Sequence, residues 1–158
     1  MNDLINQDQI IQKTLSSAKN IAMVGASSLK KEDKSNLIRK PSIIVMSYLK
    51  EFGYKVIPVN PFSLGKKIND EDVVAKLEDI KIPIDIVNVF RPSKEAVSIA
   101  EQAIKIGAKT LWLQYGVQND KAKEMVEEKN ITYIANKCIK QEYQRLFLKV
   151  NPVFPVLK

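Results

Sequence analysis

The chain has 158 residues, a length that fits one compact domain with a full hydrophobic core. Its 25 Lys and Arg residues outnumber its 18 Asp and Glu residues, which gives a formal net charge of +7. Because the sequence contains no histidine and one cysteine, it excludes a Ser-His-Asp triad, imidazole metal sites, phosphohistidine chemistry and an intramolecular disulfide.

Short apolar segments rich in Val and Ile alternate along the chain with segments of helical periodicity. The apolar segments lack the strict alternation that is typical of a strand exposed to water on one face. Their pattern is typical of parallel strands that are covered by helices on both faces. It predicts strands at residues 21–25, 55–60, 84–90, 110–113 and 131–135.

Start and stop signals mark the helices between these strands. Pro41 suits the first turn of a helix that ends at Gly53. Ser93 is expected to cap a second helix that ends at Gly107, and Asn119 opens a third. We also expect a short helix near residues 70–77 and flanking helices at about residues 8–17 and 139–149.

This succession predicts an α/β fold: a Rossmann-like, doubly wound, mainly parallel five-stranded sheet with helices on both faces. We expect the strand order 3-2-1-4-5, with the switch point between strands 1 and 4. Ligands of open α/β sheets bind beside the carboxyl ends of the strands at such a point. The expected domain covers residues 1–149, including both flanking helices, and residues 150–158 form a C-terminal tail.

The loop after the first expected strand has features of a phosphate site. It contains Gly25, Ala26, Ser27 and Ser28. A glycine lets the backbone approach a phosphate, and serine hydroxyls and amides can donate to its oxygens, although a glycine that serves only the turn explains the same residues. A basic segment follows and ends at Lys40. Such a segment either clamps anionic groups or is a solvated loop.

The loops after the second and third expected strands carry further candidates. Asn60 and Pro61 stand where NAD-binding folds usually place an acidic residue, so the neutral Asn60 counts against NAD. Arg91, at the end of the third strand, can reach a phosphate, and Phe90 can pack against an adenine. A core phenylalanine and a solvated arginine are the alternative interpretation.

The loops after the last two expected strands complete this edge of the sheet. Gln114 and Gly116 follow the fourth strand, and Gly116 again permits close backbone approach. Lys137 and Cys138 follow the fifth strand; a neighbouring cation lowers the pKa of a thiol and raises its reactivity, but an inert cysteine fits the same sequence. No pair of base and nucleophile and no metal-ligand cluster accompanies these residues, so we expect the edge to hold a phosphorylated adenine ligand without transforming it.

Six motifs occur in a fixed order at these strand ends and in the segments between them: IAMVGAS at 21–27, KPS at 40–42, YLKEFGYKVIPVNP at 48–61, DIVNVFR at 85–91, IGAKTLWLQYGV at 106–117 and KCIKQEY at 137–143. Together they resemble the small, single-domain CoA-binding proteins, whose fold is similar to the N-terminal CoA-binding domain of the succinyl-CoA synthetase α subunit. The resemblance covers about residues 14–148, and the segments GYKVIPVNP and KCxKxEY are its most specific parts.

The resemblance implies that the chain binds CoA or an acyl-CoA along the same edge. By that resemblance, the loop after the first strand holds the pyrophosphate, and the loop after the second lies beside the nucleotide. Phe90 and Arg91 then contact adenine and phosphates, Gly116 approaches the pantetheine arm, and Lys137 and Cys138 lie near its thiol. A disulfide between Cys138 and the CoA thiol is a further hypothesis.

Two segments depart from the family pattern. Residues 29–39 look like an insertion, which leaves open which cations meet the 3′-phosphate. The tail at 150–158 matches nothing in the family pattern. Synthetases that share this domain use an active histidine, which this chain lacks, so the resemblance implies binding without phosphotransfer.

Two other functions are weaker interpretations of the same sequence. A small NAD(P)-dependent oxidoreductase or redox sensor needs a G-x-G-x-x-G turn and an acidic end to the second strand, and the sequence has neither. A nucleic-acid binder would use the net charge of +7, but no nucleic-acid-binding motif accompanies it.

The expected location and partners follow from the same features. No stretch reaches the about 18–20 apolar residues that cross a bilayer, and the first residues lack a secretory signal core. We therefore expect a cytoplasmic protein with CoA or an acyl-CoA as its small-molecule partner and without membrane or nucleic-acid binding. A homo-oligomer is compatible with the sequence.

Overall fold

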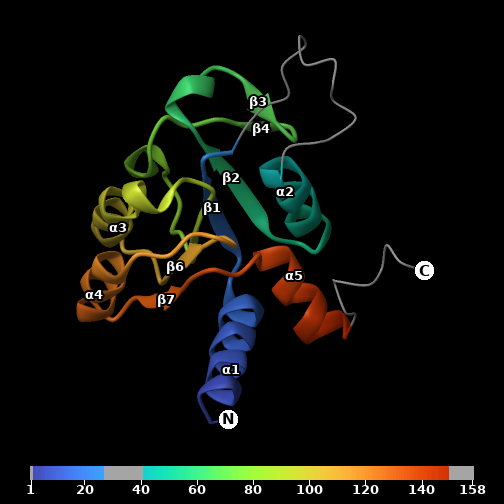
Figure 1. Ribbon diagram of the computed structural model, residues 1–158. Coiled ribbons are helices and arrows are strands. Elements are labelled where there is room, and N and C mark those ends of the chain that lie inside the picture. The colour runs from blue at the N-terminus through green and yellow to red at the C-terminus, as the bar shows by residue number, and fades with distance from the viewer. Residues whose placement is uncertain (1, 27–40, 150–158) are drawn as a thin grey trace.

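A parallel five-stranded sheet with the order β2-β1-β5-β6-β7 forms the centre of the computed structural model (Figure 1). Its strands are β1 (Asn20–Val24), β2 (Lys55–Val59), β5 (Ile86–Val89), β6 (Thr110–Leu113) and β7 (Thr132–Ile134). The structure describes residues 2–26 and 41–149. Ser27, Ser28, Lys40, the segment 29–39 that was predicted to be an insertion, and the tail at 150–158 lie outside the described residues.

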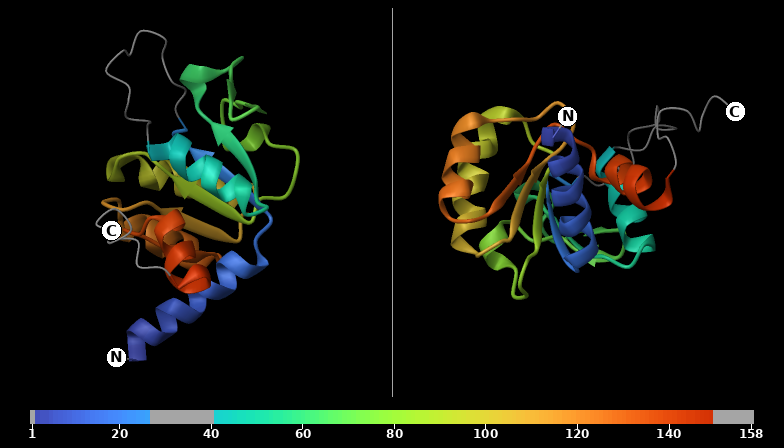
Figure 2. Two further views of the ribbon diagram at one scale, coloured as in Figure 1. Left: turned by 90° about the vertical axis from the view of Figure 1, so that its right-hand side faces the viewer. Right: turned by 90° about the horizontal axis from the view of Figure 1, so that it is seen from below.

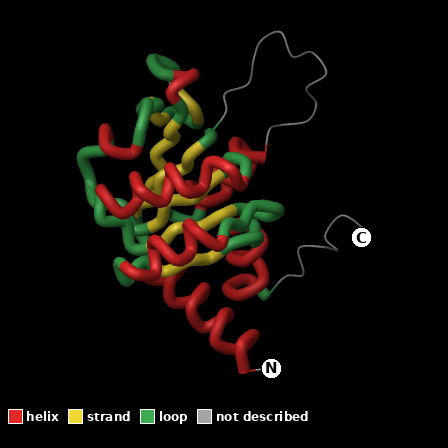
Figure 3. Tube along the Cα trace, turned by 60° about the vertical axis from the view of Figure 1, so that its left-hand side comes forward, coloured by secondary structure: helices red, strands yellow, loops and turns green. Residues whose placement is uncertain are grey.

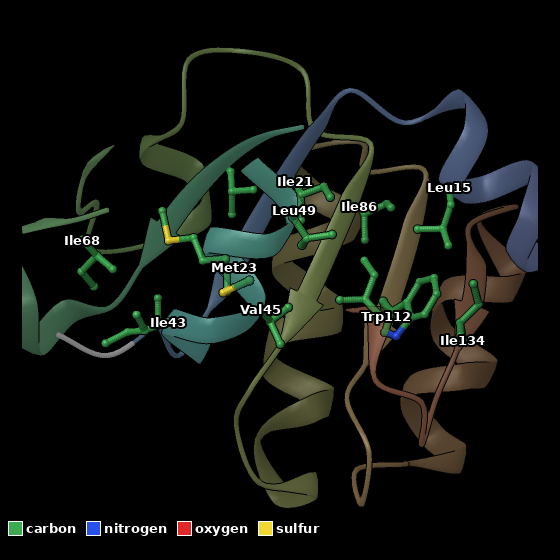
Figure 4. Packing of buried hydrophobic residues seen from close by; sticks show 14 of the residues in the cluster. Leu15, Ile21, Met23, Ile43, Val45, Leu49, Ile68, Ile86, Trp112 and Ile134 are labelled. Atoms are coloured by element: carbon green, nitrogen blue, oxygen red, sulfur yellow. The ribbon is translucent and has the colours of Figure 1, made fainter. Parts of the chain in front are cut away.

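Helices cover both faces of this sheet, as expected for a doubly wound fold (Figures 2 and 3). One face carries α1 (Asn2–Ser17), α2 (Pro41–Glu51) and α5 (Ile139–Tyr143), and α5 continues into a π-helical turn (Gln144–Leu148). The other face carries α3 (Ala96–Lys105) and α4 (Asp120–Glu128). Each face has its own hydrophobic core, and Figure 4 shows Trp112 of β6 in the core beneath α1, α2 and α5.

The expected strand order 3-2-1-4-5 is wrong. Counted along the chain, the observed order is 2-1-3-4-5, because β5 pairs with β1 from Ile21↔Ile86 to Val24↔Val89. The connection from β2 to β5 places Leu77 in the core on the α3 face, opposite α2. Since right-handed crossovers on opposite faces advance in opposite directions, the third strand returns past β1 and pairs with the side of β1 that faces away from β2. The switch point therefore lies between β1 and β5.

The prediction of a short helix near residues 70–77 is also wrong. This segment contains an antiparallel hairpin of β3 (Lys67–Ile68) and β4 (Glu71–Asp72), and a 3-10 turn follows at Leu77–Asp79. Asn69 and Asp70 have φ values of 50° and 67°. Positive φ at both central residues is what a two-residue type I′ hairpin turn requires, and Asn and Asp tolerate this conformation.

Most helix boundaries agree with those predicted from the sequence, and one predicted cap differs. The Asn119 side chain accepts the N–H of Ala122 at 2.9 Å and opens α4 as expected. Ser93 does not cap α3; it begins a 3-10 turn, and its hydroxyl accepts the N–H of Gln118 at 3.2 Å. The N-terminal helix begins at Asn2, earlier than residue 8.

The first and last helices are joined by an ion-pair network. The Arg145 guanidinium lies 2.7 Å from the Asp8 carboxylate of α1 and 3.0 Å from Glu142 of α5. Hydrogen bonding with Arg145 holds the pKa of Asp8 below its ordinary value. Within residues 2–26 and 41–149, no helix combines the length and the hydropathy needed to cross a membrane.

Candidate functional site

A cavity of about 520 Å³ lies at the carboxyl ends of β1, β2 and β5. It is lined by these strand ends, by the 3-10 turn Pro61–Ser63 after β2, by the connection toward β5 and by one stripe of α3. The α3 stripe consists of Ser98, Ile99, Gln102 and Lys105. Gln102 is four residues after Ser98 and three after Ile99, and Lys105 is three residues after Gln102, so the stripe lies on one side of the helix. The cavity thus occupies the switch point between β1 and β5, where open α/β sheets bind ligands.

Gly25 brings the β1 turn into close contact with the end of β5. Its φ is +88°, and an added Cβ atom would lie 2.8 Å from Cδ of Arg91 and 2.8 Å from the carbonyl oxygen of Phe90. The Gly25 N–H donates to the carbonyl of Val59 at 2.9 Å, and the Phe90 N–H donates to that of Val24 at 2.8 Å. A glycine is therefore required here by the close approach of Arg91 as well as by the turn.

Arg91 is held in the cavity by Glu95, one turn further along the chain. Its Nη2 and Nε atoms donate to the two Glu95 carboxylate oxygens at 2.8 and 3.1 Å. Hydrogen bonding with Arg91 lowers the pKa of Glu95 below its ordinary value, and the same bond raises the pKa of Arg91. This two-point contact orients a guanidinium beside the glycine turn, and guanidinium groups recognise phosphate through the same kind of paired hydrogen bonds.

Asn60 organises the loop after β2. Its side-chain amide donates to the carbonyl of Ala26 at 2.8 Å, and its side-chain oxygen accepts the N–H of Phe62 at 2.9 Å. Pro61 occupies the first position of the 3-10 turn that Asn60 caps. The neutral side chain that stands where NAD-binding folds place an acid therefore joins the β1 and β2 loops.

A second cationic group lies at the other end of the α3 stripe. The ammonium groups of Lys76 and Lys105 lie 3.1 and 2.9 Å from the two carboxylate oxygens of Glu78, and all three residues line the cavity. Lys105 is ten residues beyond Glu95, which corresponds to about 15 Å along a helix axis. Neither lysine was predicted from the sequence, where the helical spacing of Lys105 from Ser98 and Gln102 was the available signal.

The remaining expected residues lie around the carboxyl edge, outside the lining of the cavity. Phe90 and Cys138 pack against the core beneath α2 and α5. Gln114 is buried, and its side-chain oxygen accepts the Ile139 N–H at 3.1 Å, which fixes the start of α5. Cys138 is half-buried and has a free thiol.

Gly116 and Lys137 belong to the loops after β6 and β7. The Gly116 N–H donates to the Asn136 side chain at 2.7 Å, and Gly116 has a φ of +86°. The Lys137 ammonium lies 3.9 Å from the Glu142 carboxylate. The structure therefore brings Gly25, Asn60, Pro61 and Arg91 together at the cavity, and leaves Gln114, Gly116, Lys137 and Cys138 in the loops after β6 and β7.

The described residues contain no cluster of three or more His, Cys, Asp or Glu side chains that could hold a metal ion. Each charged side chain of the cavity forms an ion pair with another charged side chain of the cavity. This arrangement can orient and neutralise an anionic ligand by exchange of ion-pair partners.

Comparison with known proteins gives matches along most of the chain. Residues 19–144 match the family described as CoA binding domain. The protein YneT of Bacillus subtilis (strain 168) is 38% identical over 133 residues, which cover 82% of this chain and 89% of YneT.

Solved structures give matches of similar extent. A Thermus thermophilus protein, cell-free ID.343, is 36% identical with a TM-score of 0.79 over 89% of this chain and 98% of its own. A hypothetical protein from Pyrococcus horikoshii OT3 is 36% identical with a TM-score of 0.76, over 88% and 91% of the two chains. These matches extend across nearly the whole of each relative, so this chain is similar to them in length as well as in fold.

Proposed function

The chain belongs to the family of CoA-binding domains, and we propose that it holds CoA or an acyl-CoA at the carboxyl edge of its sheet without catalysing a reaction. The observation that carries this proposal is the cavity at the β1–β5 switch point, with Gly25 and Arg91 in contact. A glycine turn and an oriented guanidinium are the groups that a pyrophosphate needs.

In this arrangement the nucleotide half of the ligand occupies the cavity along α3. The turn at Gly25 and Ala26 and the guanidinium of Arg91 hold the pyrophosphate, with Asn60 and Pro61 beside the nucleotide. The pantetheine arm then leaves the cavity across the edge of the sheet toward Gly116, Gln114, Lys137 and Cys138. Ser27, Ser28 and Lys40 stay predictions for the same phosphate groups.

The chemistry of the cavity supports binding without catalysis. Proton transfer at neutral pH needs an acid or base with a pKa close to the working pH. The two carboxylates of the cavity, Glu78 and Glu95, have pKa values below their ordinary range because each accepts hydrogen bonds from cations. Both are therefore fixed as charged partners of the cavity's cations.

Thermal unfolding of the reduced protein with CoA, acetyl-CoA, NAD⁺, NADPH and ATP tests this proposal. A ligand at about 100 times its Kd adds about 2.7 kcal/mol to the free energy of unfolding, which raises the midpoint of a domain of this size by about 5–11 °C. We expect this shift with CoA or acetyl-CoA and a smaller one with the other nucleotides. A larger shift with NAD⁺ or NADPH would instead favour an oxidoreductase.

A matched pair of variants ties the shift to the cavity. Arg91→Gln removes a cation that lines the cavity, whereas Lys94→Gln removes an exposed cation of the same segment that does not line it. We expect the CoA-induced shift to fall in the first variant and to persist in the second. If no CoA species moves the midpoint of the natural protein, the proposed function is wrong.

A further inference from the structure

Phe62 is an exposed aromatic side chain on the rim of the cavity. It is 88% exposed and is one of the residues that line the cavity. Among the large hydrophobic side chains of the described residues, none is more exposed. A phenylalanine ring that faces water beside a cavity is available to a ligand without any rearrangement of the core.

The backbone beneath this ring is fixed by hydrogen bonds from two directions. The Phe62 N–H donates to the Asn60 side chain at 2.9 Å, while the Asn60 N–H donates to the carbonyl of Val74 at 2.9 Å. Asn60 in turn donates to Ala26 in the β1 turn, and Pro61 restricts the intervening φ angle. The ring therefore has only its two side-chain torsions left to set, so placing it against a ligand loses little conformational freedom.

The surroundings of the Phe62 ring suit a nucleotide, which has a flat base at one end and phosphates on its ribose. Val59 and Ile99 are buried apolar side chains that line the cavity. The Arg91–Glu95 pair lies at one end of the α3 stripe, and Lys105 with Lys76 lies at the other. A planar aromatic ligand between an apolar wall and Phe62 would have cations within reach of its anionic groups.

We propose that Phe62 stacks on the adenine base of the bound ligand and covers the open side of the cavity. This inference rests on the proposed function, because it requires an adenine-containing ligand. From the sequence, Phe90 was expected to pack against the adenine. We assign this role to Phe62 instead, because Phe90 packs against the core beneath α2 and α5. The ring is supplied by the loop after β2 and not by the end of β5.

Calorimetric titration of Phe62→Ala with CoA and with adenosine 3′,5′-bisphosphate tests this role. Stacking of a base on an aromatic side chain is worth about 1–3 kcal/mol, so we expect both Kd values to rise about 5- to 150-fold. Leu64→Ala is the matched control, because Leu64 is 62% exposed in the same loop but does not line the cavity. We expect it to bind both ligands as the natural protein does.

Phe62→Trp gives a second, independent readout. The only natural tryptophan, Trp112, is fully buried, so an indole at position 62 is the exposed fluorophore. We expect this variant to retain affinity for CoA and its fluorescence to be quenched when adenine stacks on it.

The outcomes separate this inference from the proposed function. If the natural protein binds CoA and Phe62→Ala binds it equally well, the stacking role is wrong while the proposed function stands. If Leu64→Ala weakens binding as much as Phe62→Ala, the effect belongs to the loop and the stacking role is again wrong. If the natural protein binds neither ligand, the proposed function fails and this inference fails with it.

Discussion

Gly25 and Arg91 lie in close contact, which is possible because glycine has no side chain. The φ of Gly25 is +88°, and an added Cβ would approach both Arg91 and the backbone of Phe90 to 2.8 Å. The Arg91 side chain can move, but the Phe90 carbonyl belongs to the backbone that leaves β5. The contact therefore constrains the strand end as well as the side chain.

Gly25→Ala should accordingly destabilise the protein more than Gly65→Ala. Gly65 has a φ of +87° but nothing within 4 Å of its added Cβ, so both variants share the backbone strain and only the first adds a clash. We expect the clash to lower the free energy of unfolding by a further amount of about 1–3 kcal/mol, measured by urea denaturation. Equal losses in the two variants would contradict the close contact between Gly25 and Arg91.

Three residues of this site could be predicted individually from the sequence. Gly25, Asn60 and Arg91 follow strand ends, and the carboxyl ends of parallel strands meet at one edge, so their proximity could be predicted. Phe62, Lys76 and Lys105 could not be assigned in the same way. The first two lie in the irregular connection between β2 and β5, where no periodicity relates sequence position to a face of the sheet.

At the scale of secondary structure elements, Asp85 joins the amino ends of three neighbouring strands. Its carboxylate accepts the N–H groups of Lys19 and Asn20 at the start of β1, at 2.9 and 3.0 Å, and lies 3.4 Å from the Lys109 ammonium. Burial raises the pKa of Asp85, but the backbone hydrogen bonds from Asn20 and Lys19, together with Lys109, outweigh it and leave the pKa below its ordinary value.

Asp85→Asn should therefore destabilise the protein in a pH-dependent way. A carboxyl whose pKa is lowered by folding stabilises the protein above its unfolded pKa of about 3.9, and this contribution disappears as the pH falls through the lower folded pKa. We expect the variant to lose about 1–2 kcal/mol at pH 7, because charge-assisted hydrogen bonds become neutral ones. The difference from the natural protein should shrink below about pH 4.

Urea denaturation of both proteins from pH 3 to pH 7 measures this difference, and Asp72→Asn, at an exposed position, controls for the loss of one negative charge. A deficit of Asp85→Asn that stays constant over this range would show that the carboxylate charge contributes nothing to the connection.

The strand order is one part of the fold that could not be predicted from the sequence. Periodicity identifies a buried strand, but not which strand lies beside it. Here the order depends on the face that the β2–β5 connection follows, and Leu77 packs on the α3 face. In the order 3-2-1-4-5, β5 would be separated from β1 by β2, and Arg91 could not lie against Gly25 as it does.

At the scale of the whole molecule, the residues expected to hold one ligand belong to different parts of the carboxyl edge. Gly25, Asn60, Pro61 and Arg91 line the cavity on the α3 side, whereas Gln114 contacts the start of α5. These parts lie on opposite faces of the sheet, as the positions of α3 and α5 in Figure 1 show. A ligand that reaches both parts has to be long and has to cross the edge, as a nucleotide joined to a pantetheine arm can.

Hydrogen exchange with two ligands of different length tests this crossing. Adenosine 3′,5′-bisphosphate contains the nucleotide end alone, so we expect it to protect the amides of Phe62, Ser63 and Glu95 beside the cavity. CoA should protect these and also the amides of Gly116 and Ile139, which donate to Asn136 and Gln114 on the far side of the edge. A bound ligand slows the local opening on which exchange depends, so protection maps where each part of the ligand lies.

The amide of Asp85 at the opposite end of the sheet reports any general stabilisation by the ligand, and protection at the site is measured relative to it. If CoA protects the cavity amides but leaves Gly116 and Ile139 at the level seen with the short ligand, the arm does not cross the edge. The residues after β6 and β7 would then serve the fold alone, and the site would end at the cavity along α3.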